Sequence, residues 1–405
     1  MPTHPSYPVG GFHPDSAVLC QALEAIGVKS PHTHKPLTES LVFGLAGGVG
    51  AGYSFCPSIS NRSLSGVAVV GRHLAQATNT AWFEGPLKRL ELEYEVTRAT
   101  TPGQALKNLK AQLKMGGPVI VLCGRDALPW FGEANDGGDL FMYSLLVHEI
   151  VASDEVALVS DWAGAIHRLP LKILAKSRGR IASQKYATIR IEPREQTDLG
   201  PAVLEGVAAC VQGLENPRVK TYSFEGWELW SRMMGPGKSK KAWPVVFPDG
   251  TIFRALRDVF CSIETVGTGG GLFRPVFSRF MHEASFITGQ RAFSEVASSY
   301  RRLGEGWSAL AEFSLPDRVE IFRETKNLLR KRRRAYEREG PCEEYLECTA
   351  ELNKLDISVV EDFPLDPEET SELLAVLCTE LGRLVVEERA AVRELAAAGG
   401  VEVGA

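Results

Sequence analysis

No two cysteines of the sequence stand at the C-x-x-C spacing, which argues against a structural zinc site. The eight cysteines are scattered, and most have apolar neighbours, as Cys123 has in Val121 and Leu122. Cysteines in such surroundings are typical of small buried side chains in a reducing compartment. We therefore expect a cytoplasmic protein without a metal site.

Signals for export or membrane insertion are also lacking. The first twelve residues have neither the basic region nor the apolar run of a signal peptide. The longest apolar stretch, residues 41–55, is too short and too rich in glycine to span a bilayer. The formal net charge of −5 gives no overall positive charge for nucleic acid. We expect neither membranes nor nucleic acids as partners.

Motifs for organic cofactors are missing as well. The glycine-rich stretch 44–50 has no G-x-G-x-x-G pattern between a strand and a helix, so a dinucleotide loop is not expected. Residues 235–239 are superficially similar to a phosphate loop, but Arg232 occupies the upstream glycine position. We expect no cofactor, and we interpret residues 235–239 as a loop between helices.

The length of 405 residues allows two or three domains. Within residues 1–195 a helix is followed by strands that predict a small antiparallel sheet. The polar stretch 192–200 is a candidate boundary, and residues 200–398 have a helical pattern. The sequence therefore predicts an α+β domain followed by an all-α domain. In the second domain we expect helices at 204–214, 226–234, 251–265, 275–287, 291–311, 319–339, 342–355 and 370–398.

A β-hairpin is predicted by two apolar runs, residues 145–152 and 156–159, that flank an acidic turn. His148 lies inside the first strand and Asp161 closes the second. A carboxylate that accepts one imidazole N–H fixes the tautomer and leaves the other nitrogen free as a base. On these residues alone, a strand histidine satisfied by backbone and an aspartate that caps a turn are favoured instead.

The first helix is expected to begin at Asp15 or Ser16, either of which could cap it, and to end near Ile26. His13 stands just before its N-terminus, and Cys20 lies at the flank of its buried face. The free N–H groups and the positive dipole end of such a terminus favour an anion or a thiolate nearby.

Two charged features allow two interpretations each. Glu39 starts a short helix that runs into glycines, and it is either a pocket carboxylate or a solvated residue at a helix start. The run Arg330–Arg334 lies on a predicted helix with glutamates nearby. A solvated charged face is the usual explanation of such a run. If the run binds a partner, an acidic carrier protein fits better than nucleic acid.

Short motifs occur in a fixed order through both parts of the chain. They are His13 with the helix after it, Leu37-Thr38-Glu39 with Phe43-Gly44-Leu45, Leu128-Pro129-Trp130, His148, Asp161, Leu171, Leu174, Ala175 and Arg178, then residues 264–274, Phe280, Glu283 and Ala284. In this order they resemble the family of butirosin biosynthesis protein H, over about nine-tenths of the chain.

The resemblance implies a papain-like fold for residues 1–195 and, after it, the helical domain that often follows in this family. The protein that gives the family its name is an acyltransferase that moves an aminoacyl group from an acyl carrier protein to an amine. By resemblance, we expect an enzyme of antibiotic or other natural-product biosynthesis. His148 and Asp161 match the family's base and the residue that orients it.

One departure from the family pattern affects the mechanism. The nucleophilic cysteine of the family follows the residue that matches His13, and here Pro14 occupies that position. In one interpretation another group attacks instead: Ser16 or Asp15 in the first turn, or Cys20, which lies ~9 Å from Pro14 along the helix and would need a rearrangement. In a second, the enzyme forms an amide, closes a ring or dehydrates its substrate without a covalent intermediate. In a third, the domain is catalytically silent and binds a carrier protein or a metabolite.

We prefer the second interpretation, in which His148 acts as a general base and Asp161 or Glu39 supports it. The ligand site is expected between the first helix, the Glu39 turn and the hairpin. The ligand is expected to be a small acyl or amino-acid-derived compound, and an acyl carrier protein and a second copy of the chain are further candidate partners. The candidate site residues are His148, Asp161, Glu39 and Ser16 for catalysis and His13, Asp15, Cys20, Phe43, Trp130, Trp162 and Arg274 for substrate binding.

Overall fold

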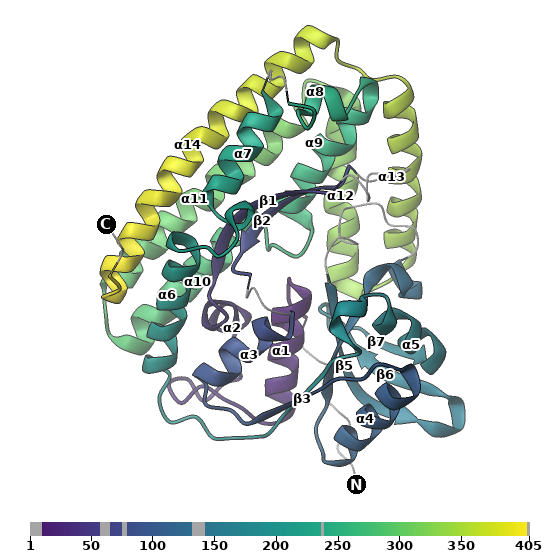
Figure 1. Ribbon diagram of the computed structural model, residues 1–405, viewed down its shortest axis with the longest axis vertical. Coiled ribbons are helices and arrows are strands. Elements are labelled where there is room, and N and C mark those ends of the chain that lie inside the picture. Colours follow the sequence, from purple (N-terminus) through teal and green to yellow (C-terminus); the bar gives the residue numbers. More distant parts are fainter. Residues whose placement is uncertain (1–9, 57–64, 75–78, 132–141, 236–238, 403–405) are drawn as a thin grey trace.

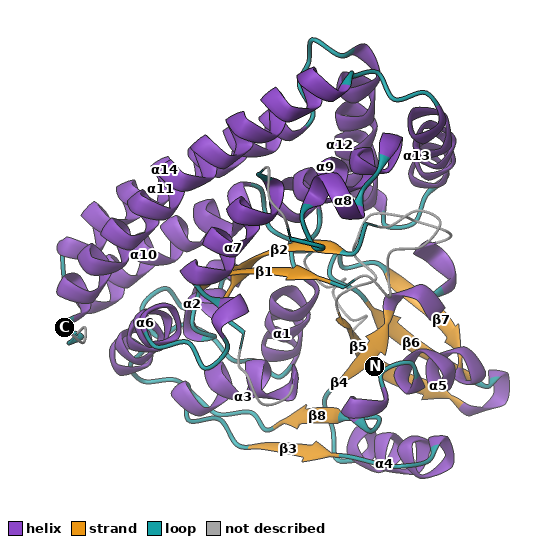
Figure 2. Ribbon diagram, turned by 45° about the horizontal axis from the view of Figure 1, so that its top comes forward, coloured by secondary structure: helices purple, strands orange, loops and turns teal. Residues whose placement is uncertain are grey.

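The computed structural model describes residues 10–56, 65–74, 79–131, 142–235 and 239–402. Strands and short helices gather at one end of the molecule, and long helices form the other end (Figures 1 and 2). The expected α+β class with antiparallel sheets and a helical C-terminal part is confirmed. No helix among the described residues is both long enough and apolar enough to cross a membrane. Most of the loop predicted at 235–239 lies outside the described residues.

The first helix, α1 (Pro14–Ala25), begins one or two residues earlier than expected. His13 is its N-cap, because the ring Nδ1 accepts the backbone N–H of Asp15 at 3.1 Å. Pro14 follows at the first helical position, where a missing N–H costs nothing. The predicted caps, Asp15 and Ser16, therefore lie inside the first turn.

A two-stranded sheet follows the short helix α2 (Glu39–Leu45). Strands β1 (Val49–Phe55) and β2 (Val67–Arg72) pair antiparallel beside the helical part. The turn into β1 needs glycine, because Gly48 has a φ of +60° and a Cβ there would lie 2.2 Å from the ring of Phe277.

The main sheet has six antiparallel strands in the order β3-β8-β4-β5-β6-β7. The predicted hairpin is confirmed as β5 and β6, which pair directly. Helix α1 packs on one face of the sheet, and the other face belongs to a second core that includes Tyr336 and Tyr345 of the helical part. The strands are β3 (Tyr94–Thr97), β4 (Val119–Gly124), β5 (Met142–Val151), β6 (Val156–Ser160), β7 (Ile166–Pro170) and β8 (Thr188–Ile191).

The helices of the second part lie close to their predicted ranges. One difference is at 251–265, where α9 ends at Phe260 and a π-helical turn continues to Thr265. The remaining helices are α3 (Asn79–Arg89), α4 (Pro102–Lys114), α5 (Leu171–Gly179), α6 (Gly200–Glu215), α7 (Phe224–Met234), α8 (Trp243–Val246), α9 (Ile252–Phe260), α10 (Arg274–Thr288), α11 (Ala292–Ser314), α12 (Glu320–Glu339), α13 (Glu343–Glu361) and α14 (Pro367–Gly399).

The two parts share one apolar core, which runs from α1 and α2 through α6, α7 and α10 to α14. The backbones approach closely where α2 meets α10, since a Cβ on Gly44 would lie 2.2 Å from the ring of Phe280. The domain boundary predicted at 195–200 stays a prediction, because the apolar core contains residues from both sides of it.

Candidate functional site

A cavity of about 100 Å³ opens at the start of α1. Figure 1 shows that the ends of α12 and α13 reach the sheet in this region. A bound water needs about 10–15 Å³, so the cavity holds roughly seven to ten groups of that size. Its wall includes His13 and Pro14 at the start of α1, Arg72 at the end of β2, Arg125, Tyr143 and Trp162 around the main sheet, Thr265, and Arg332, Arg333 and Tyr336 of α12.

His13 is held in one tautomer at the start of α1. Its Nδ1 accepts the Asp15 N–H, so a neutral ring carries its proton on Nε2. Burial lowers the pKa of His13 well below its usual value, and the nearby charges of Arg72 and Arg333 lower it further. The ring is therefore neutral at pH 7, and it lies on the wall of the cavity as a hydrogen-bond donor.

The side chains of α1 that were candidate nucleophiles, Asp15, Ser16 and Cys20, do not line the cavity. The Ser16 hydroxyl donates to Glu39 at 2.5 Å, and Asp15 accepts from Ser144 and pairs with Arg72 at 2.9 Å. Burial raises the pKa of the Cys20 thiol well above its usual value, which keeps the thiol protonated. None of these three side chains is on the cavity wall, whereas Pro14 is.

Glu39 fastens the chain that leads into α1. Its carboxylate accepts the backbone N–H groups of Phe12 at 2.9 Å and His13 at 3.1 Å, together with the Ser16 hydroxyl. Burial raises the pKa of Glu39 to about 7, although these hydrogen bonds lower it. Of the two interpretations of this residue, the structure supports a largely buried carboxylate, and its role is to position His13 and Pro14.

Asp161 has other partners than His148. Its carboxylate bonds His167 Nε2 at 2.8 Å and accepts the Tyr336 hydroxyl at 2.5 Å. It also accepts the backbone N–H groups of Ala163 at 2.9 Å and Ala165 at 3.3 Å. These bonds leave the carboxylate, which has no exposed surface, fully satisfied.

The His148 side chain and the Asp161 carboxylate lie on opposite faces of the main sheet. The Nε2 of His148 bonds the Ser160 hydroxyl at 2.9 Å, and Ser160 donates to Gln21 of α1 at 2.7 Å. Side chains of neighbouring strand residues point to opposite faces, so Ser160 and Asp161 diverge. The pairing of His148 with Asp161 that the hairpin suggested is therefore not what the described residues form, and His148 is not on the cavity wall. The catalytic roles of both residues stay predictions.

Sequence reasoning missed the contribution of α12. Residues Arg332 and Arg333 belong to the run interpreted as a solvated face, yet Arg332 is buried and Arg333 half-buried, and both lie on the cavity wall. With Leu329 and Tyr336 they stand at positions i, i+3, i+4 and i+7, which is the spacing of one helix face. That spacing is the signal that could have identified them. Tyr143 of β5, also on the wall, had no such signal.

Tyr336 and Arg333 join α12 to the sheet end of the cavity. Burial raises the pKa of Tyr336 well above its usual value, and the neighbouring Tyr143 and Asp161 raise it further. Tyr336 is therefore protonated at neutral pH and donates to Asp161. The Arg333 guanidinium lies 4.2 Å from the centre of the Trp162 ring and donates to the carbonyl of Phe12 at 2.9 Å.

The other residues expected to bind substrate are divided between wall and core. Trp162 lines the cavity, whereas Phe43 is buried and stacks on Phe273. Trp130 stacks on His167 at 3.9 Å, behind Asp161.

Arg274 has a structural role in place of the predicted substrate contact. Its guanidinium is fully buried, bonds Glu388 at 2.6 Å and donates to the carbonyls of Gly50 and Gly71 at 2.9 Å. Arg274 therefore ties β1 and β2 to the helical part, because the Glu388 carboxylate and the carbonyls of Gly50, Gly71 and Leu272 accept from four of its N–H groups. Among the described residues, no group of three or more His, Cys, Asp or Glu side chains is placed to hold a metal ion.

Comparisons with known proteins assign a family to the first part of the chain. Residues 13–162 match the family model of the N-terminal domain of butirosin biosynthesis protein H. Residues 171–334 match a domain of unknown function (DUF4872). A search of curated proteins finds no match. The first match implies a biosynthetic enzyme of the butirosin type, in natural-product or antibiotic biosynthesis. Residues 13–162 therefore form a domain of the family of the butirosin biosynthesis protein H N-terminal domain.

Proposed function

We propose that the protein forms an amide from an acyl thioester and an amine, between two molecules or within one, without an acyl-enzyme intermediate. The thioester is carried by an acyl carrier protein, as the family resemblance implies. Support comes from the wall of the cavity, which includes Pro14, the residue that the resemblance places at the family's cysteine position. The hydroxyl and thiol of Ser16 and Cys20 lie off this wall, so neither is placed to take the acyl group.

In this reaction the amine nitrogen attacks the thioester carbonyl, a C–N bond forms and the C–S bond breaks. The Nε2–H of His13 donates to the carbonyl oxygen and stabilises the charge that develops on it. The proton that the amine loses passes through the Tyr336 hydroxyl to Asp161, and it returns by the same route to the departing sulfur, which leaves as a thiol. Bringing amine and thioester together in one small cavity supplies a further part of the acceleration.

One observation carries the proposal. The donor ring of His13 and the hydroxyl of Tyr336, backed by buried Asp161, lie on the wall of the same cavity. A donor for the carbonyl oxygen and an acceptor for the amine proton are the two groups that non-covalent acyl transfer requires.

The test uses the purified full chain with acyl carrier protein thioesters and amine acceptors. Tyr336→Phe removes the relay and is expected to lower kcat by about 10²–10⁴-fold. Tyr94→Phe is the matched control, because its hydroxyl faces Glu84 away from the cavity. Intact-protein mass spectrometry during turnover is expected to show no acylated protein. An adduct on Ser16 or Cys20, or a Tyr336→Phe variant as active as Tyr94→Phe, would refute the proposal.

A second candidate is a catalytically silent member that binds a carrier protein or a metabolite. The observation in its favour is the position of His148, the base expected by resemblance, on the face of the sheet away from the cavity. This candidate predicts saturable binding of acyl carrier protein without amide product under any pairing of thioester and amine. Any turnover that Tyr336→Phe abolishes excludes it.

A further inference from the structure

The charge of the cavity differs from that of the whole protein. The chain has a formal net charge of −5, but four guanidinium groups lie on the cavity wall, those of Arg72, Arg125, Arg332 and Arg333. None of the described residues on that wall is an aspartate or a glutamate. Charges of one sign around a small concave site focus the field and attract a ligand of the opposite sign.

Three buried polar atoms of the wall residues have no hydrogen-bond partner among the described residues. They are Nη1 of Arg72 and the hydroxyl oxygens of Tyr143 and Thr265. The other terminal nitrogen of Arg72, Nη2, pairs with Asp15 at 2.9 Å. Buried donors without a partner lower the stability of the protein, and charged ones lower it most. An anion with more than one oxygen would satisfy the donors of Arg72 and Thr265.

A second, smaller cavity of about 40 Å³ lies directly behind the first. His13, Arg72 and Val266 line both cavities, which places these residues at the junction. The rest of the inner wall is mostly apolar and includes Val69, Val70, Leu74 and Phe273. At about 10–15 Å³ for each water-sized group, the inner cavity holds roughly three or four such groups.

Resting on the proposed function, we infer the class of its acyl substrate: a short acyl group that carries a free carboxylate in addition to its thioester carbonyl. Its carboxylate oxygens accept from Arg72 Nη1 and the Thr265 hydroxyl in the outer cavity. An apolar part of roughly three or four carbons extends past His13 into the inner cavity. Each methylene buried against the apolar lining of the inner cavity is expected to raise the affinity about fourfold, so chain length is selected there.

The direct test needs no mutation. Binding of linear carboxylates from acetate to octanoate to the full chain is measured by calorimetry, beside the matched primary amides. Each carboxylate of up to five carbons is expected to bind at least about tenfold more tightly than its amide, because the hydrogen bonds are charge-assisted. Affinity is expected to rise up to butyrate or pentanoate and then to stop rising. Equal affinity of carboxylates and amides, or a continued increase to octanoate, would overturn the inference.

Two variants locate the ligand. Thr265→Val is expected to weaken carboxylate binding about three- to tenfold without lowering Tm, because the hydroxyl has no protein partner to lose. Thr379→Val, on the exposed side of α14, is the matched control. Val70→Leu narrows the inner cavity and is expected to shift the preferred chain to a shorter one. If Thr265→Val binds like the control, the assigned site is wrong.

These measurements distinguish a failure of the inferred substrate class from a failure of the proposed function. Turnover of a neutral acyl thioester that requires Tyr336, together with no preference for carboxylates over amides, would leave the proposed function and remove the inference. Tight carboxylate binding without any turnover would keep the inferred ligand and remove the reaction.

Discussion

Glu39 is the residue on which the geometry at the start of α1 depends. Two backbone N–H groups and one hydroxyl converge on its carboxylate, and together they fix the segment that carries His13 and Pro14. Burial raises its pKa from 4.5 to about 7, so near neutral pH the protein contains a mixture of its charged and protonated forms. This residue therefore couples the shape of the cavity to pH.

The raised pKa of Glu39 predicts a specific pH dependence of stability. The folded state binds the proton more tightly than the unfolded state, so the contribution of Glu39 to the free energy of unfolding is full below pH 4.5 and is lost as pH rises to about 7. Over this pH range the contribution of Glu39 to the free energy of unfolding decreases by roughly 3 kcal/mol. The difference in unfolding free energy between wild type and Glu39→Gln, measured with urea, should fall over this range. A difference that stays constant or rises with pH would contradict the raised pKa.

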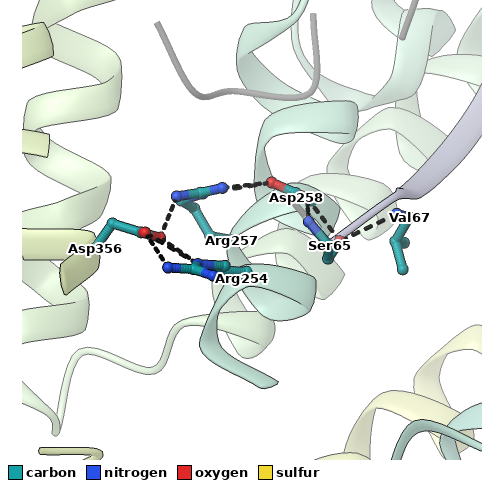
Figure 3. Close-up of polar contacts among 6 residues, drawn as sticks. All are labelled: Ser65, Val67, Arg254, Arg257, Asp258 and Asp356. Atoms are coloured by element: carbon teal, nitrogen blue, oxygen red, sulfur yellow. Dashed lines mark hydrogen bonds and ion pairs between the residues drawn. The ribbon is translucent and has the colours of Figure 1, made fainter. Parts of the chain in front are cut away.

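At the scale of elements, α12 and α13 contribute part of the cavity wall from outside residues 1–195. Figure 3 shows how α13 is held to α9. Asp356 of α13 bonds Arg257 at 2.6 Å and Arg254 at 2.8 Å, and Arg257 continues to Asp258 at 3.0 Å. Asp258 in turn accepts the hydroxyl of Ser65, just before β2, at 2.6 Å. Since α12 leads into α13, this buried network also fixes the arginines of α12.

Removal of one charge from this network should therefore affect both stability and site. Asp356→Asn leaves Arg254 and Arg257 short of a negative partner in a buried place, and we expect a loss of roughly 3 kcal/mol in the free energy of unfolding. Asp362→Asn, at the exposed end of the same helix, is the matched control and should change it by less than about 0.5 kcal/mol. The measurement is urea denaturation followed by tryptophan fluorescence. Equal stability of the two variants would show that the network does not hold α13.

The sequence predicted elements more fully than it predicted their contacts. The hairpin β5–β6 and the long helices of the second part follow from local patterns, and they lie close to where those patterns place them. Strand β1 was interpreted only as a glycine-rich turn. Its glycines are poor strand formers, and close packing requires them: a Cβ on Gly52 would lie 2.8 Å from the carbonyl of Thr221.

The site could be predicted only in part, for a physical reason. Pro14, His13, Asp161 and Trp162 were identified from the sequence, and all but Asp161 lie on the cavity wall. The partner of Asp161 was not identified, because Tyr336 lies 175 residues further along the chain. The sequence pattern of a strand does not determine which distant helix packs on it. Here that helix is α12, and its Tyr336 is the partner of Asp161.

At the scale of the whole molecule, the two family matches make one folded unit. The apolar core is continuous across residue 195, and the cavity wall combines residues from both matched regions and beyond. A site shared in this way links the family's papain-like domain to the helical domain that follows it. The helical part therefore contributes to the wall of the candidate site.

The shared core predicts that residues 1–195 do not fold alone. Without the helical part, the apolar faces of α2 and β1 that pack on α10 and α7 become exposed to water. Far-UV circular dichroism during urea denaturation should show a gradual, non-cooperative change for this fragment, and a single cooperative transition for the full chain. A cooperative transition in the fragment would show that the papain-like part is an independent domain.

The most direct test of the account compares the turnover of two variants, Tyr336→Phe and His148→Ala, under identical conditions. Tyr336 donates to Asp161 at the cavity, whereas His148 bonds Ser160 on the other face of the sheet. We predict that Tyr336→Phe loses about 10²–10⁴-fold in kcat and that His148→Ala keeps its rate within about threefold. A His148→Ala variant that is inactive beside an active Tyr336→Phe would contradict the account and restore His148 as the base.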